Sequence, residues 1–368
     1  MSNINAGFSS PAAAGYGARG NLLANAAQVR EQLDTLTRQA GNGRVADTFA
    51  GLGAAAGTTL SLRPVLTRIE TWQDNAASVE GRMDVAQASL AQISAIASSF
   101  RARTADLNGL SSAMVDSVAA GARDALRQVA GALNARHGDQ YVFAGQDSAN
   151  APLPQGEAIL ASGFVTQIAT AVAGLGVNGA AATIAATMVT ASSNAVGTSP
   201  FSTALSQPAA ALAGLQAAAP VGDRLTVPVG ILASANSDAV SSGSATTGSY
   251  MRDVLRSLAT LGALDSSQMN DAGFAELVAD VRTSLEGAIT ALNVDAGVMG
   301  DRQATIREGR AHLDGMATVL QGQIAQVEDV DMAEVLSQLA LTQTRLQASY
   351  QLLAGLQSLS LVKFLPAG

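Results

Sequence analysis

The chain has 368 residues, and at roughly 100 to 200 residues per domain this length predicts two or three compact units. Charged residues make up 14% of the sequence against a usual ~25%, and the hydrophobic share of 48% includes only 4% aromatic residues, which favours a helical protein. The net charge of −8 provides no basic footprint for a phosphate backbone, so a nucleic-acid partner is not expected.

Residue types that carry chemistry are scarce. The absence of cysteine excludes disulfides, thiolate metal sites and a cysteine nucleophile. Glu308 lies one helical turn before His312, but with His137 as the only other histidine there are too few ligands for a metal site. The one lysine, Lys363, does not form the G-K-[ST] motif of a phosphate-binding loop. We therefore expect no enzyme, no cofactor and no metal, and the first residues predict no general secretory signal peptide.

The N-terminal third predicts three helices. The first has apolar residues that step by three and four positions and ends near Gly41 and Gly43; its stripe is Leu22, Ala26, Val29, Leu33 and Leu36. After a glycine-bearing loop, the same rhythm runs from Leu62 to Phe100, which predicts a helix roughly 60 Å long. A third helix is expected at 112–136.

The C-terminal third mirrors this pattern. An apolar stripe from Phe274 to Leu292 is followed by five apolar residues at every seventh position, which predicts a coiled-coil partner helix: Met299, Ile306, Leu313, Leu320 and Val327. After a break at 328–330, a terminal helix carries Leu336, Leu339, Leu346, Tyr350 and Leu353, and Leu352, Leu356 and Leu359 widen its apolar face. That face is too broad for one partner, so the helix is expected to assemble with others.

The middle of the chain differs from both ends. No charged residue occurs at 158–222, and strand signals flank this stretch at 141–144 and 224–231. Glycine and proline interrupt the stretch and large apolar residues are sparse, so membrane insertion is not expected. The predicted fold is mainly α, with long N- and C-terminal helices paired as a coiled-coil-like bundle and a small inserted α+β outer domain. The expected segments are 1–50, 51–140, 141–250, 251–328 and 329–368.

Two short motifs have simple structural interpretations. GLGVNG at 174–179 fits the dinucleotide pattern, but the acid required about 20 residues later is missing before Asp223. The carboxylates Glu328, Asp329, Asp331 and Glu334 allow acid–base chemistry, yet Asp331 followed three residues later by Glu334 is typical of a helix cap. We therefore predict that Asp331 and Glu334 cap the terminal helix.

The C-terminal sequence resembles the flagellin superfamily. It shows a D-x-D-x-A-E start at Asp329 to Glu334, an L-Q-A-S element at Leu346 to Ser349, and an S-L-S-L segment at Ser358 to Leu361. The N-terminal loop is similar too, with Gly43, Arg44 and Val45 in the place of the family's G-[KR]-[IV] motif.

Within this superfamily, LNARHGDQYVFAG at 133–145 resembles an element typical of hook–filament junction proteins, the third hook-associated proteins. Two features depart from the family pattern: Asp47 is the only acid in the VADTFA segment after the N-terminal loop, and the tail continues to LVKFLPAG. The junction family is the favoured expectation, and a filament-forming flagellin is the alternative.

The resemblance implies a structural subunit of the extracellular bacterial flagellum, exported by the flagellar type III apparatus. The implied partners are copies of itself, other axial proteins (hook-associated proteins and flagellin) and an export chaperone. The expected assembly residues are Leu22, Val29, Leu33, Leu36, Leu336, Leu339, Leu346, Tyr350, Leu353 and Leu356. The same residues also fit the core of a monomeric bundle, and the whole pattern also fits a soluble coiled-coil adaptor or a secreted effector.

Overall fold

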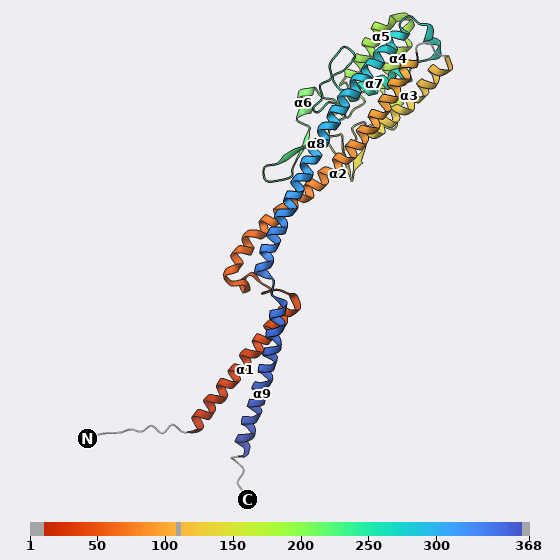
Figure 1. Cartoon of the computed structure of the whole chain (residues 1–368). Coiled ribbons are helices and arrows are strands. Elements are labelled where there is room, and N and C mark those ends of the chain that lie inside the picture. The colour runs from red at the N-terminus through yellow and green to blue at the C-terminus, as the bar shows by residue number, and fades with distance from the viewer. Residues whose placement is uncertain (1–10, 108–111, 363–368) are drawn as a thin grey trace, which may run out of the picture. The chain divides into compact units, whose positions relative to one another are not determined.

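The computed structural model describes residues 11–107 and 112–362; the side chains of 11–19, 22, 106 and 356–362 lie outside the description. The chain is mainly α, as predicted, with long helices near both ends (Figure 1). It divides into two compact units. The terminal unit combines the residues up to Arg68 with those from Met316 onward, and the central unit is Ile69–Gly315.

The terminal unit contains the outermost helices. Helix α1 spans Pro11–Asn42, a 3-10 helix, η1, spans Phe49–Ala55, and α2 begins directly after it at Ala56. Helix α8 ends at Glu328, and α9 spans Met332–Val362. The break predicted at 328–330 is therefore confirmed, and so is the end of the first helix, where Gly43 takes φ 72° and donates from its N–H to the carbonyl of Gln39.

The central unit is built on two long antiparallel helices, α2 (Ala56–Asp106) and α8 (Phe274–Glu328). Polar contacts show that the two helices run antiparallel. As the residue number on α2 increases, the number of the residue that it contacts on α8 decreases by the same amount. Glu80 accepts from Arg307 at 2.6 Å, Asp84 accepts from Gln303 at 2.8 Å, and Ser94 lies 3.2 Å from Asn293. The predicted apolar stripe on α2 is buried between them and their neighbours: Ala76, Val79, Met83, Ala86, Leu90, Ile93, Ala97 and Phe100.

Two further helices complete this bundle. Helix α3 spans Ser112–Leu133, three residues shorter than predicted, and α7 spans Tyr250–Gly262 and packs against α3. The chain leaves α3 at Asn134, whose side chain accepts from the N–H of Leu153 and donates to the carbonyl of Leu153, a turn that helix propensity does not reveal. A 3-10 helix, η3 (Ser266–Asn270), precedes α8.

The middle segment contains short elements: η2 (Ile159–Ala161), α4 (Gly163–Ala173), α5 (Leu175–Ser192) and α6 (Ala209–Ala213). Strands β1 (Arg136–His137) and β2 (Gln140–Tyr141) form one antiparallel pair, and β3 (Ala217–Pro220) and β4 (Thr226–Val229) form another. The strand predicted at 224–231 is thus confirmed at its centre. The strand predicted at 141–144 is wrong beyond Tyr141, because Val142, Phe143 and Ala144 form a buried turn, and burial in a turn selects the same apolar residues as burial in a strand.

Polar contacts bind the middle segment to the bundle. Asp295 on α8 accepts from the N–H groups of Ser237, Asp238 and Ala239 and from the hydroxyl of Tyr250 at 2.8 Å. Burial and the Asp295 carboxylate together raise the pKa of Tyr250 well above its usual value, so this hydroxyl remains a donor. Apolar residues of α4 belong to the same continuous core as α3, α7 and α8. The uncharged stretch therefore has no core separate from the bundle.

Candidate assembly interface

Helices α1 and α9 lie side by side within the terminal unit (Figure 1). Ala26 and Leu36 on α1 and Val335 and Thr342 on α9 are buried. The predicted assembly residues Val29, Leu33, Leu339, Leu346 and Leu353 are half-buried. The pair therefore shares an apolar seam that leaves many of its leucines partly open to solvent.

The rest of α9 presents apolar side chains to solvent. Leu336 is 52% exposed and Tyr350 is 50% exposed, so these two predicted residues do not contribute to the seam. Leu341 is 52% exposed and Leu352 is 61% exposed, and on α1 Leu23 is 59% exposed. Burial of such a side chain stabilises a protein by about 1.5–3 kcal/mol. On α9, Leu336 and Tyr350 lie on one side of the buried seam and Leu341 and Leu352 lie on the other side, so one neighbouring helix leaves these apolar residues uncovered.

Two further predicted assembly residues belong to these helices. Leu22 lies on α1 and Leu356 lies on α9, but both side chains fall outside the described residues.

Asp331 directly precedes α9. Its Oδ1 accepts from the N–H groups of Ala333 at 2.9 Å and Glu334 at 3.3 Å, and its carbonyl accepts from the N–H of Val335. This is the geometry of an N-cap, which satisfies amide groups that the first helical turn leaves without partners. The side chain of Glu334 instead accepts from Gln338, four residues later. Asp331 thereby fixes where α9 starts.

The two helix breaks of the terminal unit meet in a short β-bridge. The N–H of Val45 donates to the carbonyl of Glu328 at 2.7 Å, and the N–H of Val330 donates to the carbonyl of Gly43 at 3.0 Å. Arg44 and Asp329 are the bridged pair. We call residues 43–45 and 328–330, together with Arg63, the helix-break cluster. Through these hydrogen bonds, the segment after α1 is joined to the end of α8.

An ion pair reinforces this cluster. Arg63 on α2 donates through two nitrogens to the carboxylate of Glu328, at 2.6–3.0 Å, and the bonded carboxylate raises the pKa of Arg63 further above its usual value. The Arg63 guanidinium also lies 5.8 Å from the ring centre of Phe49. Sequence reasoning missed this pair because 265 residues separate its members and no local pattern connects them.

The two histidines of the sequence and its acidic side chains are the candidate metal ligands of this chain. Among the residues that the structure describes, no group of three or more His, Asp or Glu side chains has metal-ligand geometry. The ring of His137 lies over Gly81, where a Cβ atom would come within 2.6 Å of its Cε1, so this histidine packs against α2. His312 is exposed.

One helix, α5, is long and apolar enough to cross a membrane on length and composition alone. About a third of the residues of α5 (33%) are buried inside the protein.

Comparison with protein families gives one match. Residues 283–365 match the family model described as the bacterial flagellin C-terminal helical region. The match covers most of α8 and all of α9, including the Asp331 cap and the exposed leucines. No curated protein matches the chain. The C-terminal part of the chain is therefore similar to the C-terminal helical region of bacterial flagellins.

Proposed function

We propose that the protein is a structural subunit of the bacterial flagellum that polymerises through α1 and α9. The exposed apolar residues of α9 carry this proposal. Leu336, Leu341 and Leu352 are each more than half exposed although they lie on a helix that already pairs with α1. An apolar surface of this kind marks a site for protein contacts.

The residues of the seam have a second role in this proposal. Val29, Leu33, Leu36, Leu339, Leu346 and Leu353 hold α1 against α9 in one subunit, and the half-buried members complete their burial against neighbouring subunits. Leu22 and Leu356 extend the same stripes in sequence. Leu336 and Tyr350 contact neighbours only.

Within the flagellum, we favour the hook–filament junction over the filament. The YVFAG element at 141–145 supports this assignment by resemblance. In the structure its apolar residues fill the turn after β2, where Val142 and Phe143 are buried. The alternative is a filament-forming flagellin, which would use the same terminal helices.

Export by the flagellar type III apparatus, with a chaperone covering α9, completes the proposal. Isolated amphipathic helices are marginal in water until neighbours cover them, so an uncovered α9 requires protection before assembly. The lack of cysteine is compatible with passage as an unfolded chain, since no disulfide has to be undone. The expected axial partners are hook-associated proteins and flagellin.

Localisation in cells tests the proposal and separates its alternatives. An antibody against the central unit should label sheared flagella at a single position near the hook for a junction protein, and along the whole length for a filament flagellin. A soluble adaptor or secreted effector would leave the flagella unlabelled. Unlabelled flagella in an expressing, motile cell would refute the flagellar proposal.

A further inference from the structure

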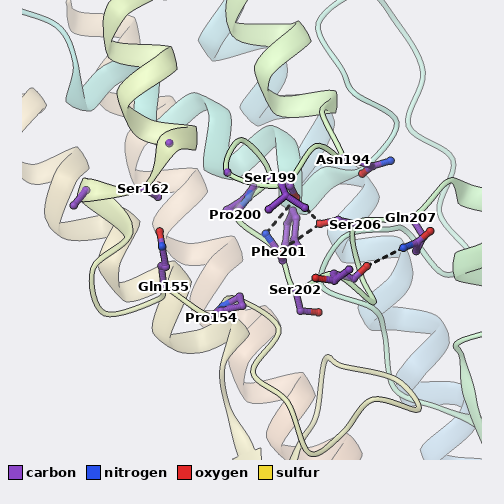
Figure 2. A pocket seen from close by; sticks show the side chains of 15 residues that line it. Pro154, Gln155, Ser162, Asn194, Ser199, Pro200, Phe201, Ser202, Ser206 and Gln207 are labelled. Carbon is purple, nitrogen blue, oxygen red and sulfur yellow. Dashed lines mark hydrogen bonds between the residues drawn. The ribbon is translucent and has the colours of Figure 1, made fainter.

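A cavity of about 450 Å³ opens in the central unit between the start of α4 and the loops at 154–155 and 194–207 (Figure 2). None of the residues that line it carries a charge. They are mainly serine, glycine, proline and side-chain amides, with Phe201 at the centre of the view. The volume lies in the range of ~300–1,000 Å³ that is usual for small-molecule sites.

The wall of the cavity is held in place from behind. Arg252 is 6% exposed and donates to the carbonyls of Ala191 and Ser193 and to Oδ1 of Asn194. Its guanidinium also lies 5.1 Å from the ring centre of Phe201, which is buried. With the bond from its Nε to the carbonyl of Ser234, all three guanidinium nitrogens of Arg252 are engaged, so the cation supports the loop and does not line the cavity. The geometry is therefore built before any ligand arrives.

The loop is further fixed by hydroxyl groups. The Oγ atoms of Ser199 and Ser206 are 2.7 Å apart, and the N–H of Ser202 donates to the carbonyl of Pro152 at 2.8 Å. Such contacts connect the 199–206 loop to the segment that precedes Gln155. The two lips of the cavity thus belong to one hydrogen-bonded frame.

Several neutral polar groups at the cavity remain open. The side-chain amide of Gln155 makes no hydrogen bond to any residue that the structure describes. Asn194 uses only its oxygen, which accepts from Arg252, and Gln207 uses only its nitrogen, which donates to the carbonyl of Thr203. The amide groups of exposed Gln155 and Asn194 and half-buried Gln207 are therefore free to pair with a ligand, and Figure 2 shows them spread along the cavity, with Gln155 on one side of Phe201 and Asn194 and Gln207 on the other.

We propose that this cavity binds a neutral saccharide. Hydroxyl groups of a sugar both donate and accept, so they pair with amide donors and acceptors of the kind that Gln155, Asn194 and Gln207 leave open. An anionic ligand would meet no cation on the lining, and a purely apolar ligand would form no hydrogen bond with these amides. The site lies in the central unit and uses no residue of the proposed assembly interface, so this inference stands or falls independently of the proposed function.

Saturation-transfer NMR on the full-length chain tests the inference. The probes are glucose, galactose, mannose and N-acetylglucosamine, with glucuronate as the charged comparison. We expect transfer to at least one neutral sugar and weaker transfer to glucuronate. Gln155→Ala should weaken the binding of the preferred sugar about two- to tenfold, which corresponds to the loss of one or two neutral hydrogen bonds.

Two further variants sharpen the experiment. Ala161→Trp places a large ring on an exposed lining position and should abolish the transfer by filling the cavity. Gln128→Ala removes an exposed amide on α3, away from the cavity, and should bind as the wild type does. Circular dichroism should show all three variants folded. Absence of transfer to every neutral sugar, preference for glucuronate, or unchanged binding in Gln155→Ala and Ala161→Trp would overturn the inference.

Discussion

The central and terminal units differ in how much of their apolar surface they bury. Among the described side chains, only five apolar residues of the terminal unit are buried, while the central unit buries a continuous core from Ala76 to Ile306; the five are Ala26, Leu36, Ala317, Ile324 and Val335. Exposed large hydrophobic residues show the reverse, with twelve in the terminal unit and six in the central unit. The central unit therefore buries its apolar residues within one chain, whereas the terminal unit exposes apolar surface that other proteins can cover.

The largest expected effect comes from charge in the α1–α9 seam. Leu346→Asp with Leu353→Asp places two carboxylates where burial without a partner costs several kcal/mol each. Polymerisation should be lost, and the main thermal transition should stay unchanged because the central unit holds neither residue. Sedimentation and circular dichroism melting measure the two outcomes. A collapsed melting temperature would show that these leucines belong to the core of the monomer.

Shortening one side chain in the core of the central unit should lower the melting temperature of the monomer. Leu285 on α8 is fully buried, so Leu285→Ala should cost about 2–5 kcal/mol of unfolding free energy. At about 2–4 °C per kcal/mol, the melting temperature should fall by roughly 4–20 °C. Leu352→Ala, at a residue that is 61% exposed, is the matched control and should change the monomer's unfolding by less than ~0.5 kcal/mol. Equal changes in melting temperature in Leu285→Ala and Leu352→Ala would contradict the difference in apolar burial between the two units.

A smaller and local effect is expected at the start of α9. Asp331→Ala removes the acceptor for the N–H groups of Ala333 and Glu334 and should cost about 0.5–2 kcal/mol in that turn. Hydrogen exchange of these amides should accelerate. Asp329→Ala is the control, because Asp329 enters the β-bridge through its backbone. Similar acceleration in both variants would argue against a specific cap.

The smallest effect concerns acid stability in the central unit. The hydrogen bond from Arg307, assisted by Arg310, holds the pKa of Glu80 below its usual value of 4.5. The stabilisation from this carboxylate is present above pH 4.5 and is lost as the pH falls through the lower value of the folded state. Glu80→Gln should therefore melt lower than the wild type at neutral pH, and the difference should shrink below pH 4.5. If the difference in melting temperature between Glu80→Gln and the wild type does not change with pH, ionised Glu80 does not stabilise the fold in this way.

Local periodicity explains why the long helices could be predicted. A step of three or four residues places apolar side chains on one face, so the buried stripe of α2 and the break before α9 follow from nearest neighbours along the chain. The Asp331 cap is similarly local. The heptad residues of α8 become less buried toward its end, from Met299 at 2% exposed to the half-buried Leu320, which periodicity alone does not predict.

Contacts between distant segments could not be predicted in this way. The pairing of Arg63 with Glu328 depends on where two helix breaks meet in space. The uncharged stretch at 158–222 suggested a separate outer domain, yet Phe164 and Ile168 of α4 pack into the main core. The absence of charge in a segment does not show which other segments of the chain it packs against. The cavity at Phe201 has no sequence signature for the same reason.

The most direct test of the account compares exposed apolar residues of the two units. Leu341→Asp with Leu352→Asp changes the open face of α9, and Val177→Asp with Val189→Asp changes residues of α5 that are 92% and 72% exposed. Sedimentation of the purified chains under polymerising conditions is the measurement. The α9 variant should stay monomeric with a wild-type melting temperature, while the α5 variant should polymerise as the wild type does. Polymer formation by the α9 variant would contradict the proposed assembly role of α9.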